Sequence, residues 1–315
     1  MRVAVFGAGG VGGYFGGRLA QAKEDVIFIA RGDHLQSMLS RGLRVDSTKG
    51  DFWVNPVQAT DDPAQVGTAD VVLVAVKAWQ VPNAAESMRP MLGPETMVLP
   101  LQNGLEAPGQ LAAVLGGQHV LGGLCGLSTF IVGPGHIRHT AIDPFVRLGE
   151  LDNRLSDRVK RLQQVFIKAE VTAEIPSDIH LAMWLKFLFI TPFSGVGAIT
   201  RSPLGVWRGL PETRRMAKET LQEIVAVGRA RGVAFSEDVL SQTMKTFDSL
   251  PPDVTASMQR DIMEGRPSEL DAQVGVVVRF GKEEGVPTPL HSFIYNCLLP
   301  MELQARGQLS FSDEP

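Results

Sequence analysis

Residues 2–13 read RVAVFGAGGVGG, an apolar run that passes directly into a glycine-rich loop. The loop fits the pattern GxGxxG, with Gly7, Gly9 and Gly12 at the glycine positions. Between a strand and a helix, these glycines allow a tight turn, a close backbone approach to a pyrophosphate and close helix packing. We therefore predict a dinucleotide-binding loop made of Gly7, Ala8, Gly9, Gly10, Val11 and Gly12. The alternative is an ordinary turn in a chain that holds 33 glycines.

The N-terminal half alternates short β-branched runs with amphipathic stretches, the first of which extends to Ala20. Four of the runs are typical of buried parallel strands: Val3–Phe6, Val26–Ala30, Val71–Val76 and Met97–Leu101. Such alternation predicts an α/β fold with a doubly wound sheet of the Rossmann type. Residues Leu43–Thr60 predict a hairpin-like excursion from that sheet. Later runs predict further strands that close the sheet: Val120–Thr129, Ile137–Thr140 and Phe145–Leu148.

The C-terminal half has a helical pattern instead. Asp152–Lys168 predicts one helix before the domain boundary. The helices predicted from Ser177 onward are Ile179–Ile190, Glu212–Arg231, Glu237–Leu250, Glu269–Glu284 and Leu290–Arg306. The chain has 315 residues, about twice the length of an average domain. We therefore predict two domains: residues 1–175 bind the dinucleotide, and residues 176–315 form a helical substrate domain.

Composition excludes several other classes of protein. The formal net charge of −4 offers no basic footprint for nucleic acid. Two cysteines cannot build a disulfide framework, and His136 and His139 have no further ligand at metal spacing, so no metal site is expected. The N-terminus lacks the apolar core of a signal peptide, which favours a cytoplasmic protein. The apolar window Leu181–Ile199 contains Lys186 and is interrupted by proline and glycine; it predicts a buried helix with one buried charge rather than a membrane span.

Polar residues at the strand ends indicate which dinucleotide binds. An acidic residue after the second strand would accept a hydrogen bond from the ribose of NAD, but Arg31 stands there. A guanidinium matches a phosphate geometrically, so we predict NADP, although an exposed arginine is often only a solvated residue and Asp33 lies two positions on. Lys77 and Asn103 follow two other strands and should reach the same edge of the sheet.

The chain resembles the ketopantoate reductases (2-dehydropantoate 2-reductases) over its whole length. The matching residues are the glycine loop with Arg31, Val76-Lys77-Ala78, Asn103-Gly104, Ser177-Asp178-Ile179 leading to Trp184 and Lys186, and Ser257 followed by Glu269. The resemblance implies a Rossmann domain and an all-helical C-terminal domain of the 6-phosphogluconate dehydrogenase C-terminal type. It also implies NADPH and a 2-keto acid as the reacting pair, in the pathway to pantothenate and coenzyme A.

The same resemblance assigns roles to individual residues. Lys186 lies among apolar neighbours, where a lysine needs a carboxylate partner or a function. We expect it to protonate the substrate carbonyl, with Glu269 as its catalytic partner or as an acceptor for a substrate hydroxyl. Ser257 would bind the substrate carboxylate, and Asn103 would position substrate or nicotinamide. The ordinary alternatives are a snorkelling lysine, a helix-start serine and a first-turn glutamate.

The chain departs from the family pattern at two positions. The family usually has asparagine four and eight residues after the lysine, where this chain has Ile190 and Ser194. Isoleucine cannot hydrogen-bond a substrate hydroxyl, whereas Ser194 can still do so through water. The substrate is therefore 2-dehydropantoate or, in a paralogue, another and more apolar 2-keto acid. Related dehydrogenases of β-hydroxyacids or opines and a non-catalytic NADP(H)-sensing protein remain alternatives.

The sequence leaves the oligomeric state open. Gly197–Thr200 and the helix Glu212–Arg231 are candidates for a homodimer surface, but an apolar helix stripe is more often part of a core. The expected partner is the small keto acid, with no nucleic acid and no membrane.

Overall fold

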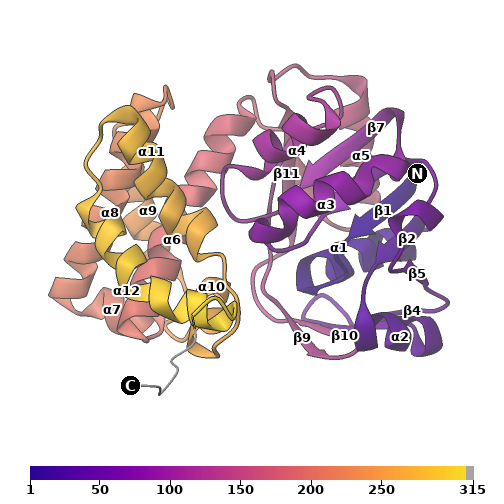
Figure 1. Ribbon diagram of the computed structural model, residues 1–315, viewed down its shortest axis with the longest axis horizontal. Coiled ribbons are helices and arrows are strands. Elements are labelled where there is room, and N and C mark those ends of the chain that lie inside the picture. The colour runs from indigo at the N-terminus through magenta and orange to yellow at the C-terminus, as the bar shows by residue number, and fades with distance from the viewer. Residues whose placement is uncertain (310–315) are drawn as a thin grey trace. The chain divides into compact units, whose positions relative to one another are not determined.

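The computed structural model describes residues 1–309 and divides into two compact units (Figure 1). The first unit comprises Met1–Gln102 and Glu106–Ala182; the second comprises Asn103–Leu105 and the chain from Met183 onward. The division falls inside one helix, a few residues after the domain boundary predicted at residue 175, which stays a prediction.

A five-stranded parallel sheet organises the first unit. Its strands lie in the order β5 (Gln58–Thr60), β2 (Asp25–Ile29), β1 (Arg2–Phe6), β6 (Ala69–Val74) and β7 (Leu92–Pro100). All four strands predicted from the β-branched runs are present. Because connections run in both directions from β1, this is the predicted doubly wound arrangement.

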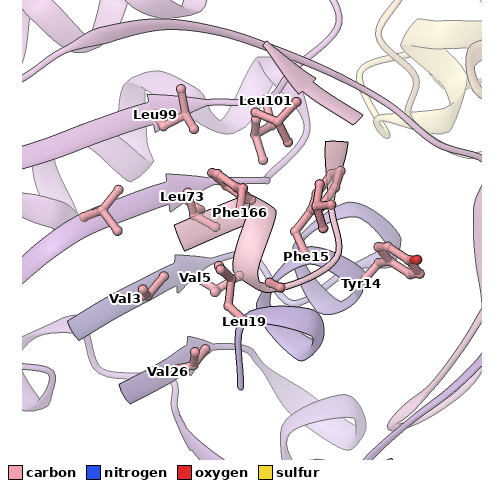
Figure 2. Packing of buried hydrophobic residues seen from close by; sticks show 14 of the residues in the cluster. Val3, Val5, Tyr14, Phe15, Leu19, Val26, Leu73, Leu99, Leu101 and Phe166 are labelled. Carbon is pink, nitrogen blue, oxygen red and sulfur yellow. The ribbon is translucent and has the colours of Figure 1, made fainter. Parts of the chain in front are cut away.

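Helices bury both faces of the sheet. Along β1, Val3 and Val5 belong to one hydrophobic cluster, while Ala4 and Phe6 belong to another. The first cluster includes buried residues of α1 (Gly10–Gln21) and α5 (Asp157–Lys168), and Figure 2 shows Val3, Val5 and Leu73 with Phe15, Leu19 and Phe166. The second includes residues of α3 (Val81–Met88) and α4 (Ala107–Leu115). Burial on both faces explains why the strands read as continuous apolar runs.

Two smaller sheets complete this unit. One has the order β4 (Phe52–Val54), β3 (Leu43–Ser47), β10 (His136–His139) and β9 (Thr129–Gly133). The other has the order β12 (Thr172–Glu174), β11 (Phe145–Glu150) and β8 (Leu121–Gly126). The predicted hairpin-like excursion over Leu43–Thr60 is confirmed for its first part by the antiparallel pairing of β3 with β4. Its last part is wrong, because Gln58–Thr60 forms β5 and pairs with β2 in the main sheet.

The expectation that the strands after Val120 close the main sheet is wrong. They form these separate sheets, and an isolated bridge joins Val98 of β7 to Val120. β9 turns back on β10 and pairs with it, so these two strands are committed to each other and to β3.

The second unit is helical. Its elements are α6 (Ile179–Thr200, which begins in the first unit), α7 (Leu204–Gly209), α8 (Pro211–Ala230), α9 (Val239–Ser249), α10 (Ser257–Met263), the π-turn η4 (Asp271–Gly275), α11 (Val276–Glu284) and α12 (Pro289–Ala305). The five helices predicted here are confirmed with small changes at their ends. The short helices α7 and α10 were not predicted.

α6 is long and apolar enough to cross a membrane by composition alone. In the structure, 72% of its most apolar window is buried inside the protein. Trp184 packs edge-on against Phe187 and Phe235, with ring centroids 5.9 and 6.2 Å apart. The apolar character of α6 is therefore used in packing within the protein.

Candidate active site

The glycine loop adopts the geometry that its sequence predicts. Gly7 has a φ of +100°, a value that side chains rarely allow, and its N–H donates to the Ile29 carbonyl at 3.1 Å. A Cβ on Gly12 would lie only 2.0 Å from the Gly7 carbonyl oxygen. The first turn of α1 therefore packs against β1 at a distance that only glycine permits.

The loop also has the open side that a pyrophosphate needs. Gly9 is the N-cap of α1, and a Cβ built there would meet nothing within 4 Å. At Gly10 a Cβ would strike the Thr129 hydroxyl at 2.6 Å, so β9 closes a different side of the loop. Backbone N–H groups at a helix N-terminus, beside space that a side chain would fill, fit a bound diphosphate.

Arg31 follows directly after the second strand, at the position predicted to contact the ribose of the dinucleotide. It is the N-cap residue of α2 (Gly32–Arg41), directly after β2, and its side chain is exposed. Within residues 1–309 no hydrogen bond or ion pair engages its guanidinium, nor does any engage the carboxylate of Asp33. Arg31 is thus available to an anionic ligand.

The ends of β6 and β7 are fastened together by a residue that sequence reasoning missed. The side-chain amide of Gln102 donates to the carbonyls of Val74 and Val76 at 2.9 and 3.0 Å. This fixes the backbone that leads into Lys77, which is half-buried and whose own N–H donates to Gln80 at 3.2 Å. The sequence signal for Gln102 is a polar residue directly after an apolar run, next to the predicted site residue Asn103.

Asn103 and Gly104 group with the second unit. Gly104 has a φ of +125°, and a Cβ there would lie 3.0 Å from the carbonyl oxygen of Ala272. Ala272 belongs to the π-turn η4, which begins two residues after Glu269. Such turns are rare and are frequently found at functional sites. The structure therefore brings the Asn103 loop to the segment that follows Glu269.

Glu269 is 6% exposed and is held by its neighbours. Its carboxylate accepts a hydrogen bond from Gln273 at 3.4 Å. The preceding residue, Ser268, donates through its backbone N–H and its hydroxyl to the buried carboxylate of Glu302, which also accepts from Arg306 at 2.6 Å. Arg306 in turn donates to the Ser268 carbonyl at 3.0 Å. These contacts fix the backbone from which Glu269 projects, a feature that no local sequence pattern indicates.

Lys186 corrects the expectation of a buried charge. Trp184, Phe187 and Leu188 are buried, but Lys186 is only half-buried and its neighbour Leu185 is 39% exposed. The apolar composition of this segment hid the face of α6 that is open to solvent. An ammonium in this position is available to a ligand without the cost of full burial.

Two hydroxyls on the next turns of α6 are buried. Thr191 and Ser194 are 1% and 0% exposed, and neither hydroxyl has a hydrogen-bond partner within residues 1–309. Ile190, beside them, is half-buried. Ser257 begins α10 and is also half-buried, with its N-cap position taken by Ala256. Ser257 therefore occupies the helix-start position that its sequence suggested.

Sequence comparison covers both units of the chain. Residues 3–153 match the family model described as "Ketopantoate reductase PanE/ApbA", and residues 178–302 match "Ketopantoate reductase PanE/ApbA C terminal". The chain belongs to the ketopantoate reductase family. The resemblance inferred from the sequence is confirmed, and ketopantoate reductases are oxidoreductases that act on CH–OH groups.

Individual relatives agree with this assignment. The chain is 31% identical to "Uncharacterized oxidoreductase YkpB" of Bacillus subtilis, over 94% of this chain and 97% of that one. It is 30% identical to "2-dehydropantoate 2-reductase" of Nostoc sp., over 98% of both. A crystal structure of a PanE/ApbA family ketopantoate reductase from Ralstonia eutropha superposes with a TM-score of 0.89 at 32% identity, covering 97% of this chain and 100% of that one.

A ternary structure of D-mandelate dehydrogenase with NADH also superposes, with a TM-score of 0.89 at 20% identity, covering 97% of this chain and 99% of that one. At this identity the likeness shows the fold alone. The family is a dinucleotide-binding reductase family, whereas the choice of dinucleotide, the substrate and the roles of single residues stay predictions for this chain.

Proposed function

We propose that this ketopantoate reductase family member reduces a 2-keto acid to a 2-hydroxy acid with NADPH, and that its substrate is 2-dehydropantoate, which yields pantoate for pantothenate and coenzyme A synthesis in the cytoplasm. The observation that carries the proposal is the exposed Arg31 at the N-terminus of α2, whose guanidinium has no partner within residues 1–309, together with a glycine loop that is open at Gly9. Relatives named 2-dehydropantoate 2-reductase over nearly the whole chain support the substrate.

NADPH is favoured over NADH on chemical grounds. A ribose hydroxyl is recognised by a carboxylate at the end of the second strand, and this chain has a guanidinium there. Arg31 can pair with the ribose phosphate of NADPH through two parallel hydrogen bonds. The N-terminus of α2 adds a favourable dipole for the same phosphate. Asp33, in the first turn of α2, is an acidic residue close to Arg31 in sequence, and its negative charge would disfavour the phosphate.

The residues of the second unit supply the acid and the substrate contacts. When bound, NADPH supplies the hydride that reduces the carbonyl carbon. Lys186 donates a proton to the carbonyl oxygen, and Glu269, on its fixed backbone, pairs with Lys186 or accepts from a substrate hydroxyl. Ser257 binds the substrate carboxylate, and Asn103 positions the keto acid or the nicotinamide.

This chain differs from the family pattern at Ile190 and Ser194, two residues predicted to face the side chain of the substrate. Ile190 offers no hydrogen bond, while the buried Ser194 hydroxyl is unsatisfied within residues 1–309. A substrate hydroxyl would lose one partner, which lowers discrimination against analogues that lack it. A related reductase of a more apolar 2-keto acid is therefore the second candidate.

The test is an assay of nicotinamide absorbance with NADPH or NADH and a panel of 2-keto acids. The panel includes 2-dehydropantoate and 2-keto acids of similar size without a hydroxyl. Preferred turnover of 2-dehydropantoate with NADPH supports the proposal. Preference for an apolar 2-keto acid supports the second candidate. Binding of NADPH without turnover of any keto acid refutes both and favours a sensing protein.

A further inference from the structure

One side chain outside the predicted site reaches the glycine loop. His34, in the first turn of α2, has its Nε2 2.9 Å from the carbonyl oxygen of Ala8, the second residue of the loop. On the other side of the ring, the backbone N–H of Gly135 donates to Nδ1 at 3.1 Å. The imidazole therefore bridges the loop and the turn between β9 and β10.

The two contacts define the protonation state of the ring. Because an N–H group can donate only to a lone pair, Nδ1 carries no proton, and Nε2 must carry the proton that is donated to Ala8. This is a neutral imidazole with a single tautomer. Burial lowers the pKa of His34, against a smaller raising effect of its hydrogen bond to Ala8, in agreement with the neutral form.

The contact with Ala8 bears directly on the adjacent Gly9. The carbonyl of Ala8 and the N–H of Gly9 belong to one planar trans peptide unit, so they point in opposite directions. With the carbonyl held by His34, the Gly9 N–H is directed away from α2. Gly9 is also the loop residue beside which a Cβ would meet nothing within 4 Å.

We propose that His34 is a positioning residue of the dinucleotide site, which holds the Ala8–Gly9 peptide so that the Gly9 N–H donates to the cofactor pyrophosphate. The inference rests on dinucleotide binding, which is part of the proposed function, but it is independent of which keto acid reacts. His34 touches the loop and not the reacting atoms, so its effect is on cofactor affinity.

A second contact between the same elements provides a matched control. The Ser37 hydroxyl, one turn along α2, donates to the Pro134 carbonyl at 2.7 Å and accepts from Arg41 at 2.8 Å. Ser37 thus also fastens α2 to the turn before β10, without contacting the glycine loop. Ser37→Ala removes a comparable tertiary contact and leaves the Ala8–Gly9 peptide held.

Acid should weaken the arrangement. A protonated Nδ1 cannot accept from Gly135, and a charged ring near the N-termini of α1 and α2 is unfavourable. The other titratable groups on the elements around the ring are Arg31, Asp33 and Arg41 on α2, Arg44 and Asp46 on β3, His136, Arg138 and His139 on β10, and Tyr14 and Arg18 on α1. His136 pairs with Asp46 at 2.8 Å. All of these groups, and the cofactor phosphate, are common to the wild type and the variants.

The experiment measures NADPH affinity of the full-length protein by nucleotide fluorescence at pH 8 and at pH 5, because the lowered pKa of His34 places its protonation below the usual range of a histidine. The thermal midpoint of the apo protein is measured alongside. His34→Ala should raise the Kd for NADPH about tenfold or more at pH 8, as expected for a misdirected hydrogen bond to a charged group. Ser37→Ala should change the Kd for NADPH less than about threefold. Its thermal midpoint should fall by about as much as that of His34→Ala, because each variant removes a comparable tertiary contact. His34→Gln, which can donate and accept at once, should restore most of the affinity.

The pH dependence separates positioning from a purely structural role. The wild-type Kd should rise more steeply between pH 8 and pH 5 than that of His34→Gln, because only the imidazole takes up a proton in this range as its lowered pKa is passed. Equal Kd values for His34→Ala and Ser37→Ala would overturn the proposal. Should His34→Ala fail to fold, an identical pH dependence of Kd in wild type and His34→Gln would overturn it. Absence of keto acid turnover would count against the proposed reaction and leave these binding results unaffected.

Discussion

Replacing single glycines of the phosphate loop separates cofactor binding from folding. Gly9→Ala adds a methyl group where nothing lies within 4 Å, on a backbone with φ −68° and ψ −162° that alanine readily adopts. Alanine at an N-cap costs roughly 0.5–1 kcal/mol, and the lower entropy of its unfolded chain offsets about 0.4–1 kcal/mol of that. We therefore expect a thermal midpoint close to that of the wild type.

Cofactor binding should respond differently. The new methyl group would occupy the space through which the pyrophosphate approaches the backbone, so that at least one charged hydrogen bond is lost. Such a bond contributes about 1.5–3 kcal/mol, which corresponds to a roughly ten- to hundredfold rise in the Kd for NADPH. The assay is a fluorescence titration of NADPH, with thermal unfolding of the apo protein measured in parallel.

Gly12→Ala is the comparison. Its Cβ would lie 2.0 Å from the Gly7 carbonyl oxygen, a backbone atom that cannot move without shifting the strand end. Overpacking of this kind costs about 1–3 kcal/mol, so the thermal midpoint of this variant should fall by several degrees. A Gly9→Ala protein that binds NADPH as tightly as the wild type would refute the claim that the loop holds the pyrophosphate.

Three further predictions concern other parts of the chain. Arg31→Ala should raise the Kd for NADPH at least about tenfold and leave the Kd for NADH nearly unchanged. An equal rise in both Kd values would exclude a contact between Arg31 and the ribose phosphate. Lys186→Ala should lower kcat by about ten- to ten-thousandfold with little change in the Kd for NADPH, and an active variant would remove the lysine from the mechanism. Burial alone would raise the pKa of Glu150, but hydrogen bonds from Arg158 and Ser156 and the charge of Arg158 lower it. This carboxylate should therefore stabilise the fold fully above about pH 4.3, and its contribution should be lost as the pH falls through the lowered pKa. In acid unfolding experiments, Glu150→Gln should accordingly reduce the loss of stability with falling pH, and an unchanged pH profile would contradict the assignment.

The sequence predicted the parts of the fold that depend on local constraints. The loop from Gly7 to Gly12 was predictable because each glycine meets a steric requirement visible in the motif. The strands of the main sheet were predictable because burial on both faces demands uninterrupted apolar runs, as in Val71–Val74. The strands after Val120 were assigned to the wrong sheet, since their apolar pattern does not specify a pairing partner.

The parts of the candidate site that were missed depend on tertiary contacts. Gln102 and His34 act by reaching backbone carbonyls of distant segments, and a carbonyl has no sequence signature. Glu302 lies 34 residues from the Ser268 that it holds. The exposure of Lys186 was not predicted, because the apolar composition of the surrounding segment includes residues from every face of α6. Helix α10 has only seven residues, too few to produce a clear period.

The most direct test of the account is the stoichiometry of one reaction. Purified protein is mixed with NADPH and 2-dehydropantoate, and the NADPH consumed is compared with the 2-hydroxy acid formed. We predict one hydroxy acid for each NADPH oxidised, with much slower turnover when NADH replaces NADPH. Tight NADPH binding with no hydroxy acid from 2-dehydropantoate or from any other 2-keto acid would contradict it.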